Sequence, residues 1–282
     1  MEVIRAMSVS IHTNTSAMIA LQNLNASNKQ LEDVQQKIST GLAVSTAKDN
    51  ASVYAIAQGQ RADLGGLNAV KDSLHRASSI ADVSMAAGES VSDLMNQLRE
   101  KVVGAMDTSI DTTSRNALNG DFQSILGQIQ HIVENATFNG SNILNGSLAT
   151  NIQFIANADA NSVITLSVRT MSLGGPILTV TSQSALSTPT IASQILSQVD
   201  TSILNLNASL GALGSQAKQI EGHLSFVDKL TDAITGGIGN LVDADMAVES
   251  SKLQALQVQQ QLGTQSLSIA NQSPQQILAL FK

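Results

Sequence analysis

The chain has 282 residues, a formal net charge of −7, no cysteine and only 2% aromatic residues, although 43% of its residues are hydrophobic. The acidic balance argues against a general nucleic-acid binder, because neutralising phosphates requires clustered Lys and Arg. Scarce aromatic rings argue against an ordinary enzyme pocket, the lack of cysteine excludes disulfides and zinc–thiolate sites, and no run of 18 apolar residues predicts a membrane span.

The first predicted helix follows a polar, β-branched leader at residues 8–16, which we expect to be poorly ordered on its own. Small and apolar residues then recur every three or four positions, and Gly41 marks a helix end. The seam consists of Ala17, Ala20, Leu24, Ser27, Leu31, Val34 and Ile38. Residues 39–66 are predicted to form an irregular connector with short helical pieces.

A longer seam runs from Leu67 to Ala105 and is interrupted only at Ser84 and Gly88. Apolar residues recurring every 3.5 positions without proline are typical of a helix that lies along another helix. At 1.5 Å per residue this stretch would be roughly 58 Å long. After a polar turn at residues 107–113, apolar residues from Leu118 to Ala136 predict a third helix that folds back beside the second.

The pattern changes at residues 138–146, where two Asn-Gly pairs predict tight turns. Residues 151–155 and 162–168 are predicted strands, and residues 177–180 are a candidate third strand. A helical seam returns from Leu196 to Ile234. Glycines at positions 236, 237 and 239 then predict a break, and a last helix is expected to end near Pro274. Its predicted seam consists of Leu241, Ala244, Val248, Ser251, Ala255, Val258, Leu262, Gln265 and Ile269.

These elements predict a mainly α fold, in which long antiparallel coiled-coil helices from both chain ends pack together around a small mid-chain β-hairpin region. We expect the hairpin at the far tip of the molecule. The terminal helices have wide apolar stripes flanked by Gln and Asn, which suits packing against further copies of the chain.

Catalytic or metal-binding groups do not converge in the sequence. The four histidines are scattered, and none has a neighbour at metal-ligand spacing. Asp243, Asp245 and Glu249 cluster at the start of the last helix, where carboxylates interact favourably with the helix dipole, so a cation site is the weaker interpretation. We therefore expect no enzyme activity, no cofactor and no metal.

Several motifs of this chain resemble bacterial flagellin, the subunit of the flagellar filament. They occur in the family's order at both ends of the chain, and the C-terminal match is the more complete. The matching stretches are residues 14–24 (NTSAMIALQNL), 38–42 (ISTGL), 47–50 (AKDN), 54–57 (YAIA), 138–146 (FNGSNILNG), 240–247 (NLVDADMA), 255–257 (ALQ), 269–272 (IANQ) and 280–281 (LF).

The resemblance implies a minimal flagellin without large variable outer domains. Residues 1–40 would form an N-terminal inner-tube helix with a disordered leader, and residues 237–282 the C-terminal inner-tube helix. Residues 41–138 and 190–236 would form the two parts of the helical outer tube. Residues 139–189 would hold the turns and the small β-hairpin.

The resemblance also implies partners and a location. Flagellins are exported unfolded through the flagellar type III channel, which agrees with an N-terminus that lacks the apolar core of a cleavable signal peptide. The expected partners are copies of this chain, sister flagellins, the export apparatus and its chaperone, the filament cap and the hook-junction protein. Neither nucleic acid nor membrane insertion is expected. Met7 is a candidate for the true first residue in place of Met1.

One departure from the family concerns innate immunity. Flagellins sensed by the host's flagellin-recognising Toll-like receptor tend to carry a Gln-Arg-x-Arg-Glu-Leu block on the long helix. Here Arg99 and Glu100 are kept, but Gln97 replaces an Arg and Lys101 replaces a Leu. This difference leads to the hypothesis that the protein evades the receptor.

We expect self-assembly to depend on the apolar faces of the terminal helices. Alternative interpretations are a hook–filament junction or accessory flagellar coiled-coil protein, and a signalling coiled coil, which would not explain the β region. An enzyme is the weakest interpretation. The residues expected to carry assembly are Leu24, Leu31, Val34, Val258, Leu262 and Ile269.

Overall fold

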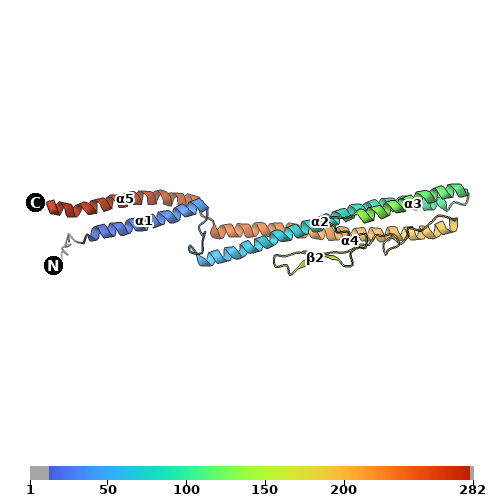
Figure 1. Cartoon of the computed structure of the whole chain (residues 1–282), viewed down its shortest axis with the longest axis horizontal. Coiled ribbons are helices and arrows are strands. Elements are labelled where there is room, and N and C mark those ends of the chain that lie inside the picture. The colour runs from blue at the N-terminus through green and yellow to red at the C-terminus, as the bar shows by residue number, and fades with distance from the viewer. Residues whose placement is uncertain (1–12, 280–282) are drawn as a thin grey trace. The chain divides into compact units, whose positions relative to one another are not determined.

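The computed structural model describes residues 13–279, with side chains described as far as residue 272. Within these residues it confirms the mainly α fold with one small antiparallel β-hairpin (Figure 1). The elements are α1 (Thr15–Thr40), α2 (Ala51–Ala105), α3 (Thr112–Asn135), β1 (Ile152–Ile155), β2 (Val163–Leu166), α4 (Pro189–Val242) and α5 (Met246–Ala279). The N-terminal leader, the choice between Met1 and Met7, and the Leu280-Phe281 motif lie wholly or mostly outside the described residues.

The chain divides into two compact units. The terminal unit comprises the residues up to Arg61 and those from Thr235 onward, and the central unit comprises residues 62–234. The long helices α2 and α4 therefore each contribute to both units.

In the terminal unit, α1 and α5 lie side by side, and local capping defines both ends of α1. The Asn14 side chain accepts a hydrogen bond from the backbone N–H of Ala17 (3.0 Å), so the helix begins at Thr15, inside the leader that we expected to be poorly ordered. Gly41 adopts a left-handed conformation (φ 73°) and its N–H donates to Lys37 O, which confirms the predicted helix end.

The predicted connector at residues 39–66 is wrong in its extent. The link between α1 and α2 is only residues 41–50, because Asn50 accepts a hydrogen bond from Val53 N (3.2 Å) and starts α2 at Ala51. Within the link, the backbone N–H groups of Ala43 and Val44 donate to Val242 O. The alanines that follow Asn50 favour helix, which outweighs the scattered glycines.

The central unit holds the apolar core, which α2, α3 and α4 build from their predicted seams. Ser84 and Gly88, the two interruptions of the α2 seam, also face inward: Ser84 is 1% exposed and donates to Ile80 O, while a Cβ at Gly88 would lie only 2.5 Å from Cδ2 of Leu210. Both positions are small because α4 packs closely there. Fully buried residues include Leu74, Met95, Leu98, Phe122, Leu126, Ile129, Leu206, Leu213 and Ile220.

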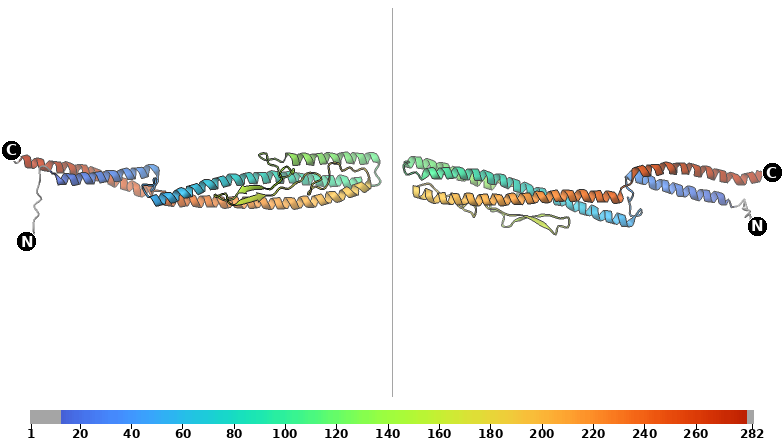
Figure 2. Two further views of the ribbon diagram at one scale, coloured as in Figure 1. Left: turned by 60° about the horizontal axis from the view of Figure 1, so that its bottom comes forward. Right: turned by 180° about the vertical axis from the view of Figure 1, so that it is seen from behind.

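The β-hairpin lies beside the long helices of the central unit and not at its tip, so that expectation is wrong (Figure 2). Polar side chains of the helices hold the strand backbones in place: Ser73 of α2 accepts from Ile155 N (3.2 Å), and the His223 ring of α4 contacts Ala156 O (2.6 Å). The end of the unit is formed instead by the turn between α2 and α3. These hydrogen bonds link residues far apart in sequence, so periodicity alone does not reveal them.

Three further boundaries differ from the prediction. Residues 177–180 form no strand and contribute only an isolated bridge between Leu173 and Leu178. Helix α4 continues through the three glycines to Val242, and the actual interruption before α5 is at residues 243–245. Helix α5 continues through position 274 to Ala279, so the predicted end near that position is wrong.

Candidate functional site

The α1–α5 pair is held by a seam that mixes apolar and polar contacts. Val34 is 7% exposed and Leu256 is 8% exposed. A Cβ added at Gly263 would lie 3.1 Å from the Leu24 side chain, so the helices approach closely there. Asn14 Nδ2 donates to Ala270 O (2.7 Å), at the start of α1. Little of this seam is fully buried, in contrast to the core of the central unit.

The six predicted assembly residues fall into two groups. In α1, Leu24 and Leu31 are half-buried and Val34 is buried, all on the seam towards α5. The three residues of α5 are instead exposed, by 54% at Val258, 62% at Leu262 and 60% at Ile269. The structure therefore uses the first group inside the subunit and leaves the second group on its surface.

The apolar stripe predicted for α5 does not face α1. Its members at positions 248, 251, 255, 258, 262, 265 and 269 are all exposed. The seam towards α1 lies one or two positions further along the helix and consists of Glu249, Leu253, Leu256, Gln260, Gly263, Leu267 and Ala270. Helix α5 thus carries two neighbouring stripes, and α1 covers only one of them.

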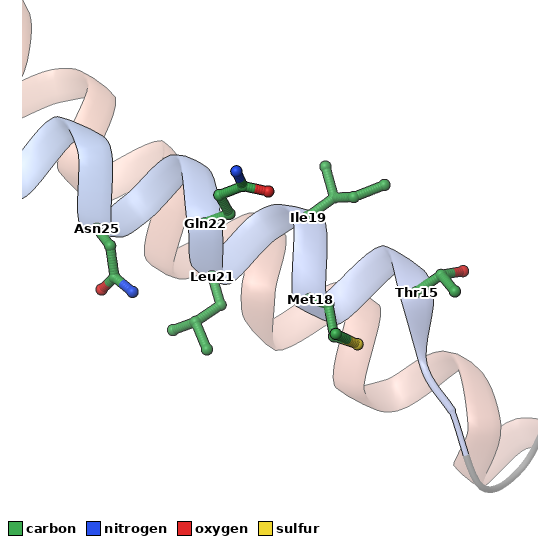
Figure 3. Close-up of a pocket in the computed structure, with 6 residues that line it drawn as sticks. All are labelled: Thr15, Met18, Ile19, Leu21, Gln22 and Asn25. Carbon is green, nitrogen blue, oxygen red and sulfur yellow. The ribbon is translucent and has the colours of Figure 1, made fainter.

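Helix α1 also presents apolar residues that its seam does not include. Met18 is 66% exposed, Ile19 59% and Leu21 47%. Together with Thr15, Gln22 and Asn25 they line an open hollow on the side of α1 away from α5, with Met18, Leu21 and Asn25 pointing to one side (Figure 3). The seam pattern did not single these residues out, because they lie off it. Large apolar residues outside the seam of a helix were the signal that could have identified them.

The exposed apolar residues lie in a part of the chain without formal charges. Residues 13–28 and 253–272 contain no Asp, Glu, Lys or Arg. Met18, Ile19 and Leu21 therefore lie among neutral amides and hydroxyls, as do Val258, Leu262 and Ile269. We name the outward faces of α1 (Met18, Ile19, Leu21) and α5 (Val248, Val258, Leu262, Ile269) the terminal apolar faces.

The acidic residues at the start of α5 have structural roles. Asp245 caps the helix by accepting from Ala247 N (2.9 Å) and Val248 N (3.1 Å). Glu249 is 7% exposed, and its Oε1 accepts from Lys252 Nζ (2.7 Å). Among the described residues, no three His, Asp or Glu side chains gather as a metal site would require. The helix-dipole interpretation agrees with this arrangement.

A second capping carboxylate organises the link between α1 and α2. Asp49 accepts hydrogen bonds from Thr46 N (2.8 Å) and Ser45 N (2.9 Å), and these backbone donors lower the pKa of its carboxyl below the ordinary value. The hydroxyls of the same two residues also donate to this carboxylate. The link is therefore an ordered turn around one anion.

The predicted receptor-like segment lies on α2 in the central unit. Arg99 Nε donates to Asp200 of α4 (2.7 Å) and Lys101 Nζ donates to Asp121 of α3 (2.8 Å). The hydrogen bond from Lys101 to Asp121 raises the pKa of the lysine. The side chains of Gln97 and Glu100 are exposed, while Leu98 between them is fully buried. Arg99 and Lys101 of the segment thus form ion pairs with neighbouring helices, while the side chains of Gln97 and Glu100 face the solvent.

Two family models match most of the chain. The bacterial flagellin N-terminal helical region matches residues 11–149, and the bacterial flagellin C-terminal helical region matches residues 196–281. The chain belongs to the bacterial flagellin family. Its role is accordingly that of a structural subunit of the flagellar filament, which serves motility.

Relatives match this flagellin along its whole length. It is 49% identical to flagellin FljJ of Caulobacter vibrioides, over 98% of this chain and 99% of the relative. It is 37% identical to a flagellin of Brucella melitensis, over 97% of this chain and 99% of that protein. A crystal structure of Bacillus cereus flagellin aligns with a TM-score of 0.49 and 19% identity, covering 55% of this chain and 88% of that one. No helix among residues 13–279 of this flagellin is long and apolar enough to cross a membrane.

Proposed function

We propose that this flagellin joins its neighbours in the filament through the terminal apolar faces. The observation that carries the proposal is the exposure of Val258, Leu262 and Ile269, since all three are more than half exposed on one face of α5. Large apolar side chains gathered on one exposed face are typical of interaction surfaces, because burying each stabilises association by about 1.5 to 3 kcal/mol. Met18, Ile19 and Leu21 of α1 extend the proposed surface.

The predicted set divides under this proposal. Leu24, Leu31 and Val34 act indirectly, because they hold α1 against α5 and so position the exposed stripe. Val258, Leu262 and Ile269 make the contacts between subunits. The stretches that carry Met18, Ile19 and Leu21 and Val258, Leu262 and Ile269 contain no formal charges, so we expect the strength of association through these residues to depend little on salt.

Replacing Leu262 by Asp tests the proposal. The carboxylate would be buried without a partner in the subunit interface, so polymerisation from seeded fragments should be lost, as seen by electron microscopy. Leu262→Met is the matched control and should polymerise normally, since it conserves volume and apolar character. Because Leu262 is exposed in the subunit, circular dichroism of the Asp variant should remain close to wild type. Normal filaments from Leu262→Asp would refute the assignment.

The finer biology that we propose follows the family. The chain would be exported unfolded through the flagellar type III channel to an extracellular filament, meeting the export apparatus, its chaperone, the cap and the hook-junction protein on the way. The sparse burial in the α1–α5 pair supports export in the unfolded state, because a weakly packed unit is readily unfolded for transport. The protein would act without catalysing a reaction. Cells lacking a working export apparatus should retain the protein, and its appearance in their medium would contradict the route.

Co-assembly with sister flagellins is a further part of the proposal. Several relatives with 45–49% identity are flagellins of one Caulobacter vibrioides strain. If this chain has sister flagellins, mixed seeding should give filaments that contain both chains along their length. Filaments that grow from like seeds only would exclude co-assembly. The full-length matches to named flagellins favour a filament subunit over the hook-junction alternative.

We also propose weak activation of the flagellin-recognising Toll-like receptor. Lys101 is engaged with Asp121, and the position opposite the family's Arg is the neutral Gln97. In a reporter-cell assay, purified monomer should activate weakly, and the double variant Gln97→Arg/Lys101→Leu should activate more strongly. Arg99→Ala in that double variant serves as the loss-of-function control. Strong activation by the wild-type monomer would overturn the hypothesis.

A further inference from the structure

Six glycines gather in two helical stretches where buried apolar residues are lacking. In α2, no residue between Ala57 and Leu67 is buried, and this stretch contains Gly59, Gly65 and Gly66. In α4, no residue between Val227 and Val242 is buried, and this stretch contains the glycines at positions 236, 237 and 239. We name residues 58–66 and 228–241 together the glycine segment.

Where the two stretches belong to the terminal unit, Gln60 of α2 lies close to Gly237 of α4. A Cβ added at Gly237 would lie 3.9 Å from Oε1 of Gln60. That oxygen is buried, yet it accepts no hydrogen bond from any described residue. A buried acceptor without a partner destabilises the closed, packed arrangement relative to an opened one that water can enter. The contact is therefore a weak point between the two helices.

Half of these glycines have no steric reason to be glycine. A Cβ at Gly66 would meet Ala158 at 2.9 Å, and one at Gly239 would meet Asp243 Oδ2 at 2.8 Å. By contrast, nothing lies within 4 Å of a Cβ at Gly59, Gly65 or Gly236. Those three positions lower helix stability without allowing any closer packing in the subunit.

We propose that the glycine segment is a hinge at which both long helices bend or open locally while their flanks stay ordered. The chain's division into compact units falls inside it, after Arg61 in α2 and before Thr235 in α4. Both flanks are anchored: Ala57 is fully buried, and Val242 is 1% exposed with its carbonyl accepting from Ala43 N (2.7 Å). Sparse burial and weak helix formers are the features of a segment that opens at low free energy.

Hydrogen exchange resolved to single amides tests the hinge in assembled filaments, where the flanks are held. The hinge predicts a local minimum of protection at residues 58–66 and within residues 228–241, with slower exchange on both sides of each stretch. Simple fraying predicts instead that protection from exchange declines steadily along each helix. A steady decline, or protection equal to that of residues 70–105, would overturn the inference.

Alanine variants provide a second test of the hinge. Gly59→Ala/Gly65→Ala/Gly236→Ala should slow exchange in the glycine segment by about fivefold for each glycine replaced in the helix concerned. The matched control is Gly211→Ala/Gly214→Ala, because these α4 glycines also have nothing within 4 Å of an added Cβ but lie beside the buried Leu213. The control should leave exchange in the glycine segment unchanged. An unchanged rate in the triple variant would contradict the hinge.

Discussion

Both units of this flagellin are built from paired helices, but they bury apolar side chains to very different extents. In the central unit, α2, α3 and α4 bury long seams of large apolar residues, and residues such as Leu98, Ile129 and Leu206 are fully inaccessible. In the α1–α5 pair of the terminal unit, Val34 and Leu256 are the only buried apolar residues among those whose side chains the structure describes, up to position 272. The central unit therefore has an apolar core of its own, whereas the α1–α5 pair buries few apolar side chains.

The difference follows from where each helix places its large side chains. Helix α4 turns most of them inward, although Leu204 and Phe226 are exposed. Helix α5 divides its own between a seam towards α1 and an exposed stripe that includes Leu262. A helix pair that buries so little gains little free energy from folding alone, because conformational entropy opposes ordering. We therefore expect the central unit to fold on its own and the terminal pair to become stable only in contact with other copies of the chain.

The largest expected effect is the loss of a core side chain from the central unit. Leu206→Ala should lower the free energy of unfolding by about 2 to 5 kcal/mol, because Leu206 is fully buried and the change leaves a cavity. Urea denaturation of the monomer measures this. A loss below about 0.5 kcal/mol, the range of ordinary surface substitutions, would mean that the central core is not what stabilises the subunit.

A smaller effect is expected where α2 and α4 approach each other. Gly88→Ala places a Cβ 2.5 Å from Leu210 Cδ2, so overpacking of about 1 to 3 kcal/mol opposes a helix-propensity gain of about 1 kcal/mol. Thermal unfolding should show net destabilisation. Gly214→Ala in α4 meets nothing within 4 Å and should stabilise instead. Equal stabilisation of both variants would show that Leu210 moves aside without cost.

A third substitution examines the terminal unit. Leu256→Ala changes a buried side chain of the α1–α5 pair, which we expect to be only weakly stable in the monomer, so it should change the monomer's free energy of unfolding by less than about 0.5 kcal/mol. It should weaken the filament, because α5 loses part of its support. A loss in the monomer as large as that for Leu206→Ala would remove the contrast between the units.

The smallest effect is an acid dependence at the turn between α2 and α3. Asp111 caps α3 by accepting from Ser114 N (2.9 Å). Hydrogen bonding to the Ser114 side chain, together with this bond to its backbone N–H, lowers the pKa of Asp111 below its ordinary value of 3.8. Its contribution to stability is therefore present above pH 3.8 and is lost as the pH falls through the lowered pKa. Asp111→Asn keeps a capping side chain without a titrating group, so denaturation at neutral and acid pH should show a slightly smaller acid loss in the variant. Identical pH profiles would contradict the role of the cap.

Much of the fold could be predicted from periodicity and turn residues. The seams of α2 and α4, the end of α1 at Gly41 and both strands follow from local patterns. The continuation of α4 through Gly236 could not be predicted, because glycine disfavours helix locally while the helix nevertheless continues on both sides of it. The hairpin's position depends on contacts such as that of His223 with Ala156, which link residues distant in sequence.

The candidate site was predicted only in part. Apolar periodicity selected the stripe that contains Leu262, but it does not distinguish a stripe that faces a partner helix from one that faces outward. The seam towards α1 contains Gly263, which allows close approach, and Gln260, which donates to Asn28 Oδ1 (2.8 Å). A search for apolar residues passes over both. Exposure in the folded subunit provides the missing distinction.

The contrast between the units is tested most directly by hydrogen exchange on the same chain as monomer and as filament. We predict slow exchange in both states for the core helices of the central unit, residues 70–105 of α2 and 195–227 of α4. For α1 and α5, at residues 15–40 and 246–272, we predict fast exchange in the monomer and slow exchange in the filament. Slow exchange of α1 and α5 in the monomer would contradict the account, because the terminal pair would then be stable without other copies.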